Sequence, residues 1–169
     1  WGYGLGNGLR LTASYGTAFK APTFNELYFP GFGNPNLRPE ESQSVELGIE
    51  GTASAGRWSL NAYETRVDNL IAFDAATSAP ANIDQARIRG LEAVIVARLE
   101  EWNLRTSLTL LDPENRASGA NRGNVLPRRA EQALRLDLDR AIGRYRLGAT
   151  LFAEGRRFDD LANTREMGG

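Results

Sequence analysis

The sequence predicts an all-β protein in which about seven strands follow one another as an antiparallel meander. Three observations favour this fold class. Apolar and polar residues alternate over most of the chain, short and long connections take turns between the alternating segments, and an aromatic residue opens the strand after each short turn. An alternation with a period of two is typical of a strand whose two faces meet different surroundings. No segment predicts a helix.

Each predicted strand has an apolar residue at every second position. In the first, Leu9 and Leu11 alternate with Arg10 and Thr12, and the following strands repeat this pattern with Val, Leu, Ile or Trp. The fourth strand differs, because apolar residues occupy both of its faces. The predicted strands cover residues 9–16, 45–50, 58–63, 91–99, 102–110, 134–139 and 145–152.

The connections between these strands alternate in length. Short ones fall near residues 52–57, 100–101 and 141–144, whereas long ones cover about 19–39, 74–85 and 111–128. A meander with this alternation has tight turns at one end and large loops at the other. Transmembrane β-barrels are built in this way, with short periplasmic turns and long extracellular loops.

Aromatic residues agree with a membrane barrel. The strands after the short turns open with Trp58, Trp102 and Tyr145. Tryptophan and tyrosine rings favour the boundary between membrane and water, so these three predict one arc of an aromatic girdle. Four more aromatics lie towards the loop ends and would belong to a second girdle: Tyr15, Phe19, Phe73 and Phe158.

The polar faces of the strands fit a wet barrel interior, and they would include Arg105, Asp137 and Asp139. The same alternation would also fit a soluble antiparallel β-sandwich or small-barrel binding domain, with its leucines in the core. Alternation alone does not separate the two architectures. The aromatic girdle and the asymmetry of the connections favour the membrane barrel.

The composition argues against several classes of function. The net charge is −1, so no basic surface suggests nucleic-acid binding. The chain contains no cysteine and no histidine, which removes the commonest zinc ligands and the commonest general base. We therefore predict no catalytic residues, no metal site and no cofactor, and we expect that the protein is not an enzyme.

Several charged or glycine-rich motifs have a simpler interpretation than a catalytic or metal site. Residues 2–8 predict a tight turn, because no helix follows that would make a phosphate-binding loop. Asp137 and Asp139 predict a charged wall lining. Calcium at Asp159 and Asp160 would need further ligands. Two arginines at a loop–strand junction on the outer side would either pair with lipopolysaccharide phosphates or serve as rim charges: Arg128 and Arg129.

A resemblance to a known family rests on residues 14–51, SYGTAFKAPTFNELYFPGFGNPNLRPEESQSVELGIEG. This stretch resembles the barrel of TonB-dependent outer-membrane receptors, and NPNLRPEES is its most specific part. Residues 58–73, WSLNAYETRVDNLIAF, and 86–99, ARIRGLEAVIVARL, resemble the strands that follow in that family. The cobalamin receptors are the nearest subgroup, with the catecholate-siderophore receptors close to them.

The resemblance implies that residues 1–169 are a segment of a larger transmembrane β-barrel of about 22 strands. We expect a partial receptor barrel domain in which the plug domain and the final strands are absent. Such receptors lie in the bacterial outer membrane and take up a scarce ligand, here cobalamin or an iron-siderophore. The expected partners are outer-membrane lipid, that ligand, and the TonB protein only through the absent plug.

The long connection at residues 19–39 is the predicted ligand-binding loop. It combines aromatic rings with amide side chains, and the candidate residues are Tyr28, Phe29, Phe32, Asn34 and Asn36. A corrinoid ring or an aromatic siderophore would pack on such rings. The alternative is that the rings pack on one another or on a neighbouring loop. Pro35 and Pro39 would stiffen the loop where it re-enters the wall.

Overall fold

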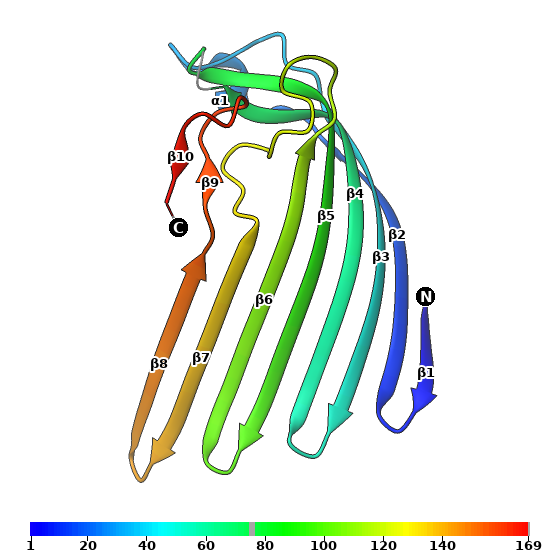
Figure 1. The fold of residues 1–169 in the computed structure, drawn as a ribbon, viewed down its shortest axis with the longest axis vertical. Helices are drawn as coiled ribbons and strands as arrows, with labels where there is room; N and C mark the ends of the chain where they lie inside the picture. Colours follow the sequence, from blue (N-terminus) through cyan, green and yellow to red (C-terminus); the bar gives the residue numbers. More distant parts are fainter. Residues whose placement is uncertain (75–76, 169) are drawn as a thin grey trace.

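The computed structural model describes residues 1–74 and 77–168, and it confirms the all-β antiparallel meander. Eight strands form one sheet in which each strand pairs with its neighbours in the chain (Figure 1). These strands are β1 (Gly2–Gly6), β2 (Leu9–Lys20), β3 (Glu40–Ala53), β4 (Gly56–Asp74), β5 (Ala79–Leu99), β6 (Trp102–Asn115), β7 (Gln132–Ile142) and β8 (Tyr145–Glu154).

Smaller elements lie among the long connections. A short helix, α1 (Phe24–Tyr28), follows β2, and a two-stranded sheet of β9 (Arg157–Phe158) and β10 (Glu166–Met167) follows β8. Among the residues that the structure describes, no helix has the length and apolar character needed to cross a membrane.

The strand register gives the sheet two chemically different faces. Residues opposite one another in neighbouring strands share a face, so continuous rows of side chains cross the sheet. One row is almost wholly apolar and consists of Leu11, Ile49, Leu60, Ala93, Leu108, Leu134 and Ala153. The adjacent row lies on the other face and consists of Thr12, Gly48, Asn61, Glu92, Thr109, Ala133 and Glu154.

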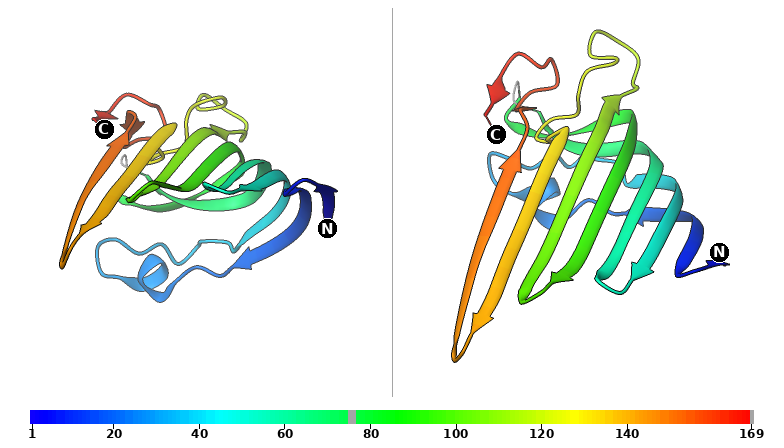
Figure 2. Two further views of the ribbon diagram at one scale, coloured as in Figure 1. Left: turned by 90° about the horizontal axis from the view of Figure 1, so that it is seen from below. Right: turned by 60° about the horizontal axis from the view of Figure 1, so that its bottom comes forward.

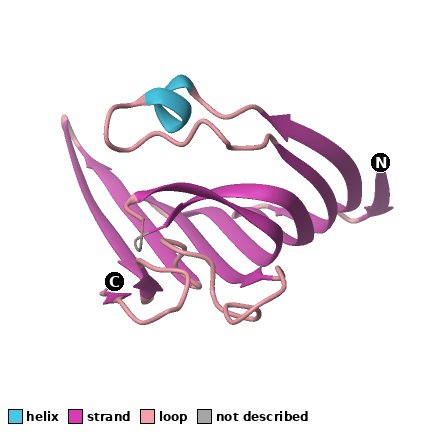
Figure 3. Cartoon of the chain, turned by 90° about the horizontal axis from the view of Figure 1, so that it is seen from above, coloured by secondary structure: helices cyan, strands magenta, loops and turns pink. Residues whose placement is uncertain are grey.

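The sheet is strongly curved, and its polar face lines the concave side. In Figures 2 and 3 the connection that carries α1 crosses over the concave side of the sheet. Lys20, which belongs to the polar face, reaches Glu26 of α1 with a distance of 3.6 Å between Nζ and Oε1. The apolar rows therefore form the convex face, where their side chains stay exposed: Leu47 keeps 62% of its accessible surface and Leu147 keeps 59%.

The three aromatics of the predicted girdle lie on the convex face near the short turns. Trp102 and Tyr145 are each covered by an arginine, with Arg140 and Arg144 at 5.6 Å and 5.2 Å from the ring centroids. Trp58 lies across from Gly51, where a β-carbon would come within 2.5 Å of the indole nitrogen. Glycine at position 51 is what leaves room for this ring.

Three parts of the sequence-based prediction were wrong about where strands begin or end. Residues 2–6 form β1 rather than part of a turn, and the hairpin turn is Asn7–Gly8, where both residues have positive φ. Residues 79–85 of the predicted long connection belong to β5, so only residues 75–78 join it to β4. Residues 75 and 76 lie outside the described part of the chain. The third long connection also begins later than expected, since β6 continues to Asn115.

The strand extensions escaped detection because their apolar residues come in consecutive runs, such as residues 70–73, rather than in alternation. Leu70, Ile83 and Ala86 form a buried cluster with Val67 and Leu126, and Leu126 comes from the connection after β6. A consecutive apolar run lacks the period of two that marks a strand with one polar face. Burial at this end of the sheet therefore comes from the long connections that fold over it.

A charge on the convex face should be far more damaging than the same charge on the concave face. Leu108→Arg places a guanidinium among the apolar rows and should cost about 2–4 kcal/mol if that face meets lipid. Thr109→Arg, also one residue away but opposite Glu92 on the polar face, should cost little. Unfolding titrations of both variants in phospholipid vesicles measure the difference. Equal losses at the two positions would contradict this assignment of the faces.

Candidate functional site

The candidate site is the connection between β2 and β3, residues 21–39, together with the segments against which it packs. The N-cap of its helix α1 is Thr23, whose hydroxyl accepts from the Glu26 amide at 3.3 Å, while Glu26 Oε2 accepts from the Thr23 amide at 2.6 Å. This reciprocal pair is a capping box. The sequence T-F-N-E carries that signal, although the helix was not predicted. The chain then turns back so tightly that a β-carbon on Gly33 would lie 2.6 Å from the Leu27 carbonyl oxygen.

The motif NPNLRPE fastens this connection to the β4–β5 hairpin. Asn34 Nδ2 donates to the Pro80 carbonyl at 3.0 Å. Asn82 takes the place of a strand partner, because it accepts from the Arg38 amide at 2.8 Å and donates to the Arg38 carbonyl at 3.0 Å. Leu37, in the middle of the motif, is buried. Pro35 lies in a turn that the Leu37 amide closes on the Asn34 carbonyl at 3.3 Å, and Pro39 immediately precedes β3.

Aromatic rings and an arginine join the connection to three other segments. Phe32 stacks on Phe73 of β4, with ring centroids 6.3 Å apart and planes 10° apart, and Phe29 meets Phe32 edge to face. Arg128, from the connection after β6, lies over Phe73 at 4.3 Å from the ring centroid. Its Nε also donates to Asp159, from the connection after β9, at 2.8 Å. Side chains far apart in the sequence thus form one stack.

The predicted ligand-binding residues divide into an exposed and an engaged group. Tyr28 and Phe29 keep 58% and 55% of their accessible surface, and Asn36 is also exposed. Phe32 is part of the stack, and Asn34 uses its amide for Pro80 and its carbonyl for the Asn36 amide. Sequence reasoning missed Phe24, which is 74% exposed and packs against Tyr28 with ring centroids 5.3 Å apart.

Four other charged residues that the sequence singled out are also engaged. Arg128 does not project from the outer side, because it pairs with Asp159 among the connections. Arg129 approaches Tyr63, whose side chain lies on the concave face. Asp160 accepts hydrogen bonds from the Thr164 and Arg165 amides at 2.9 Å and 2.8 Å, which lowers the pKa of its carboxyl group below the usual range.

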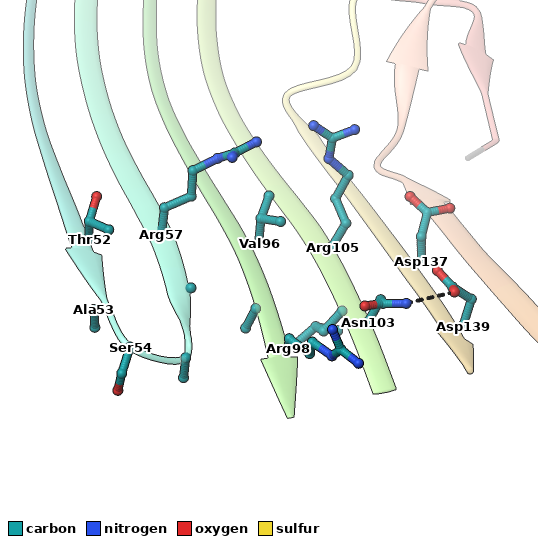
Figure 4. Close-up of a pocket in the computed structure, with 14 residues that line it drawn as sticks. Thr52, Ala53, Ser54, Arg57, Val96, Arg98, Asn103, Arg105, Asp137 and Asp139 are labelled. Atoms are coloured by element: carbon teal, nitrogen blue, oxygen red, sulfur yellow. Dashed lines mark hydrogen bonds between the residues drawn. The ribbon is translucent and has the colours of Figure 1, made fainter. Parts of the chain in front are cut away.

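The two acids of the β7 strand line an open hollow of about 640 Å³ on the concave face near the short turns (Figure 4). Asp137 is held by Arg135 at 2.8 Å, and Asp139 accepts from Asn103 Nδ2 at 2.9 Å. Arg57 and Arg105 also line the hollow. The hollow is therefore a charged part of the wall, in which the charges of acidic and basic side chains offset one another.

Comparisons with known proteins give one consistent match. The family described as "TonB dependent receptor-like, beta-barrel" matches residues 1–169. The vitamin B12 transporter BtuB of Photobacterium profundum is 33% identical over 172 residues, which cover 98% of this chain and 28% of that protein. The chain therefore spans less than a third of the length of this relative.

Solved structures share the fold. The copper transporter OprC superposes with a TM-score of 0.77 at 19% identity, over 99% of this chain and 26% of that one. The siderophore receptor PiuA from Acinetobacter baumannii gives a TM-score of 0.75 at 20% identity, over 98% of this chain and 26% of that one.

Removing the Asn82 side chain should release the candidate loop and leave the sheet in place. Asn82→Ala leaves backbone groups of Arg38 and Asn69 without the partner they use, at a cost of about 1–3 kcal/mol. Amide hydrogen exchange at residues 34–39 should then accelerate. Asn103→Ala, which removes a hydrogen bond at the opposite end of the sheet, is the control. Unchanged protection of residues 34–39 in Asn82→Ala would show that the motif does not hold the loop.

Acid should loosen α1 through Glu26. Burial opposes ionisation of this side chain, but hydrogen bonds with Thr23 and the Lys20 ammonium outweigh burial and lower the pKa of Glu26. A carboxyl group whose pKa is lower in the folded state stabilises that state at pH values above its ordinary pKa. This stabilisation is lost as the pH falls through the folded-state pKa, in the range below about pH 5. Hydrogen exchange at residues 23–28 should accelerate there in the parent chain and much less in Glu26→Gln. An equal acid response in both would assign the effect to another group.

Proposed function

Because this chain belongs to the TonB-dependent receptor β-barrel family, we propose that it forms part of the wall and extracellular loops of an outer-membrane active-transport receptor. The convex face meets the hydrocarbon core of the outer membrane, and the concave face lines the barrel interior. The short turns lie on the periplasmic side, and the connection that carries α1 lies on the extracellular side. The family consists of receptors for transport, so the wall has no catalytic task.

The observation that carries this proposal is the exposure of the apolar rows. A soluble sandwich would bury them against a second sheet, with the two layers about 10 Å apart. Here the convex face has no covering layer within the described residues, and leucines remain more than half exposed on several strands. An apolar surface that spans eight strands fits lipid and would be a strong aggregation hazard in water.

The ligand of the proposed receptor is cobalamin or an iron-siderophore. The 33% identity to a vitamin B12 transporter supports the first, and the fold shared with siderophore receptors is compatible with the second. Both classes of ligand offer flat or aromatic surfaces to the exposed rings of Phe24, Tyr28 and Phe29. Asn36 is the exposed amide of the predicted set. TonB would act through a plug domain rather than through the residues described here.

Membrane extraction tests the proposed location directly. The full-length protein should stay with the outer-membrane fraction after washing with alkaline carbonate and urea, and it should need detergent for release. A folded barrel should also migrate faster before boiling than after boiling in dodecyl sulfate electrophoresis. Release by carbonate, with a soluble folded product, would favour the soluble β-sandwich instead.

Ligand affinity should depend on the exposed rings of the α1 connection. Phe24→Ala, Tyr28→Ala and Phe29→Ala are tested singly in the full-length receptor, and a ring that stacks on the ligand should cost roughly 1–3 kcal/mol of affinity. Phe32→Ala should act differently, because it breaks the stack on Phe73 and loosens the whole connection. Equilibrium binding of radiolabelled cobalamin and of ferric siderophores gives the readout.

Tyr145→Ala is the matched control for these variants, since Tyr145 is an exposed ring at the other end of the same sheet. It should leave both affinities unchanged. If the three ring variants also bind both ligands as tightly as the parent, with the connection still ordered, these residues do not belong to the binding site.

A further inference from the structure

Arg128 has an unusual backbone conformation among the long connections. Its φ is 59°, in the left-handed region that a residue with a side chain rarely adopts. Its amide donates to the Phe158 carbonyl at 2.7 Å. Two residues earlier, the buried Leu126 donates its amide to the Pro113 carbonyl, also at 2.7 Å. The backbone is thus fixed at and just before the left-handed residue. Such a conformation persists where its surroundings hold it, and an observed one is a reason to look for a function.

The guanidinium group of Arg128 has two partners. Its Nε donates to Asp159 Oδ1 at 2.8 Å, and its central carbon lies 4.3 Å from the centroid of the Phe73 ring. A cation within about 6 Å of an aromatic face is attracted to the ring. Asp159 is itself fixed, because its amide donates to the Arg165 carbonyl at 2.9 Å. The acid therefore orients the planar guanidinium group, and that group restrains Phe73.

The Phe73 ring in turn restrains the connection that carries α1. Phe32 stacks on it with ring centroids 6.3 Å apart. The amides of Phe32 and Gly33 donate to the Phe29 carbonyl at 3.1 Å and 2.7 Å. Phe29 is the C-cap of α1, and its own amide donates to the Asn25 carbonyl at 3.2 Å. The position of Phe32 therefore determines where the C-terminal end of α1 lies.

Helix α1 cannot hold its own orientation. It has five residues, none of them buried, and a helix of this length is not stable alone in water. Its exposed rings, Phe24 and Tyr28, pack on each other. The turn that follows α1, residues 29–34, is held by Phe32 on Phe73 and by the hydrogen bond between Asn34 and the Pro80 carbonyl. The orientation of the exposed rings therefore depends on these contacts.

We propose that Arg128 is a positioning residue for the ligand site. By restraining Phe73 it restrains Phe32, and so it keeps the exposed rings of the α1 connection in place before the ligand arrives. This inference rests on the proposed role of those rings in ligand binding. A site that is ordered in advance binds more tightly, because binding does not have to supply the free energy of ordering it.

A direct contact between Arg128 and an anionic ligand is the rival role, since the Arg128 side chain is 52% exposed. The two roles affect the kinetics of binding differently. Loss of a positioning residue lowers the fraction of receptors that are ready to bind, which lowers the association rate and leaves the dissociation rate nearly unchanged. Loss of a direct contact acts mainly on the dissociation rate.

The test measures both rates in the full-length receptor with two probes, cyanocobalamin, which has no net charge, and ferric enterobactin, which is anionic. Arg128→Gln should lower the association rate about three- to tenfold, and it should change the dissociation rate less than about twofold. Arg128→Lys keeps a cation that can lie over the ring, so it should recover part of the association rate. Asp159→Ala should also slow association, although it leaves the region more positive. A direct contact with an anion predicts tighter binding of ferric enterobactin by Asp159→Ala.

A second measurement needs no ligand. Amide hydrogen exchange at residues 24–33 should accelerate in Arg128→Gln, although Arg128 lies far from these residues in the sequence. Phe73→Leu removes the aromatic face that Arg128 covers, and it should reproduce both effects of Arg128→Gln. The double variant should then be no worse than either single variant, because the two residues act in one chain of contacts.

Arg156→Gln is the matched control. Arg156 lies over the Phe158 ring, at 5.9 Å from its centroid, so this variant removes the same charge from the same kind of contact in the connection after β8. It should change neither the association rate nor the exchange at residues 24–33. Unchanged association and exchange in Arg128→Gln, an equal loss in the control, or a loss confined to dissociation would overturn the proposal.

The result also separates this inference from the proposed function. If the single ring variants of the α1 connection weaken ligand binding and Arg128→Gln does not, only the positioning role fails. If the ring variants bind both probes as tightly as the parent does, the proposed ligand site fails, and the positioning role fails with it.

Discussion

The continuous antiparallel ladder from β1 to β8 is the constraint on which the rest of the structure depends. Each strand satisfies the N–H and C=O groups of its neighbours, so that the backbone can cross an environment without water. The register also aligns side chains into rows, and a slip of one residue would exchange the two faces. The apolar row through Leu60 and Leu108 and the polar row through Asn61 and Thr109 are therefore set by a single property of the fold.

The end of the sheet that carries the long connections differs, because the strands there continue beyond the apolar rows. The extensions of β4 and β5 bury Leu70 and Ile83 under the long connections rather than in lipid. Asn82 of β5 holds the NPNLRPE motif by bonding the Arg38 backbone as a strand partner would, and the stack around Phe73 joins this connection to two others. The loop end is thus a packed layer, from which a few rings of α1 project.

Much of this architecture could be predicted from the sequence, because the alternation of apolar and polar residues indicates a sheet with two unlike faces. The strands at residues 9–16 and 102–110, the short turns and the convex position of Trp58, Trp102 and Tyr145 all followed from it. β1 was missed because the glycines around its Tyr3 and Leu5 indicate a turn, and the extensions of β4 and β5 because their apolar residues are consecutive. The roles of Asn34 and Phe32 depend on contacts with Pro80 and Phe73, more than 40 residues away. No local pattern contains that information.

The assignment of lipid to one face and water to the other is the central claim, and spin-label accessibility along β6 tests it most directly. The chain has no cysteine, so a single cysteine introduced at each of residues 103–110 carries one label in the reconstituted receptor. Collision with oxygen should peak at 104, 106, 108 and 110, and collision with a water-soluble nickel complex should peak at 103, 105, 107 and 109. A profile without this period of two, or with the two sets exchanged, would contradict the account.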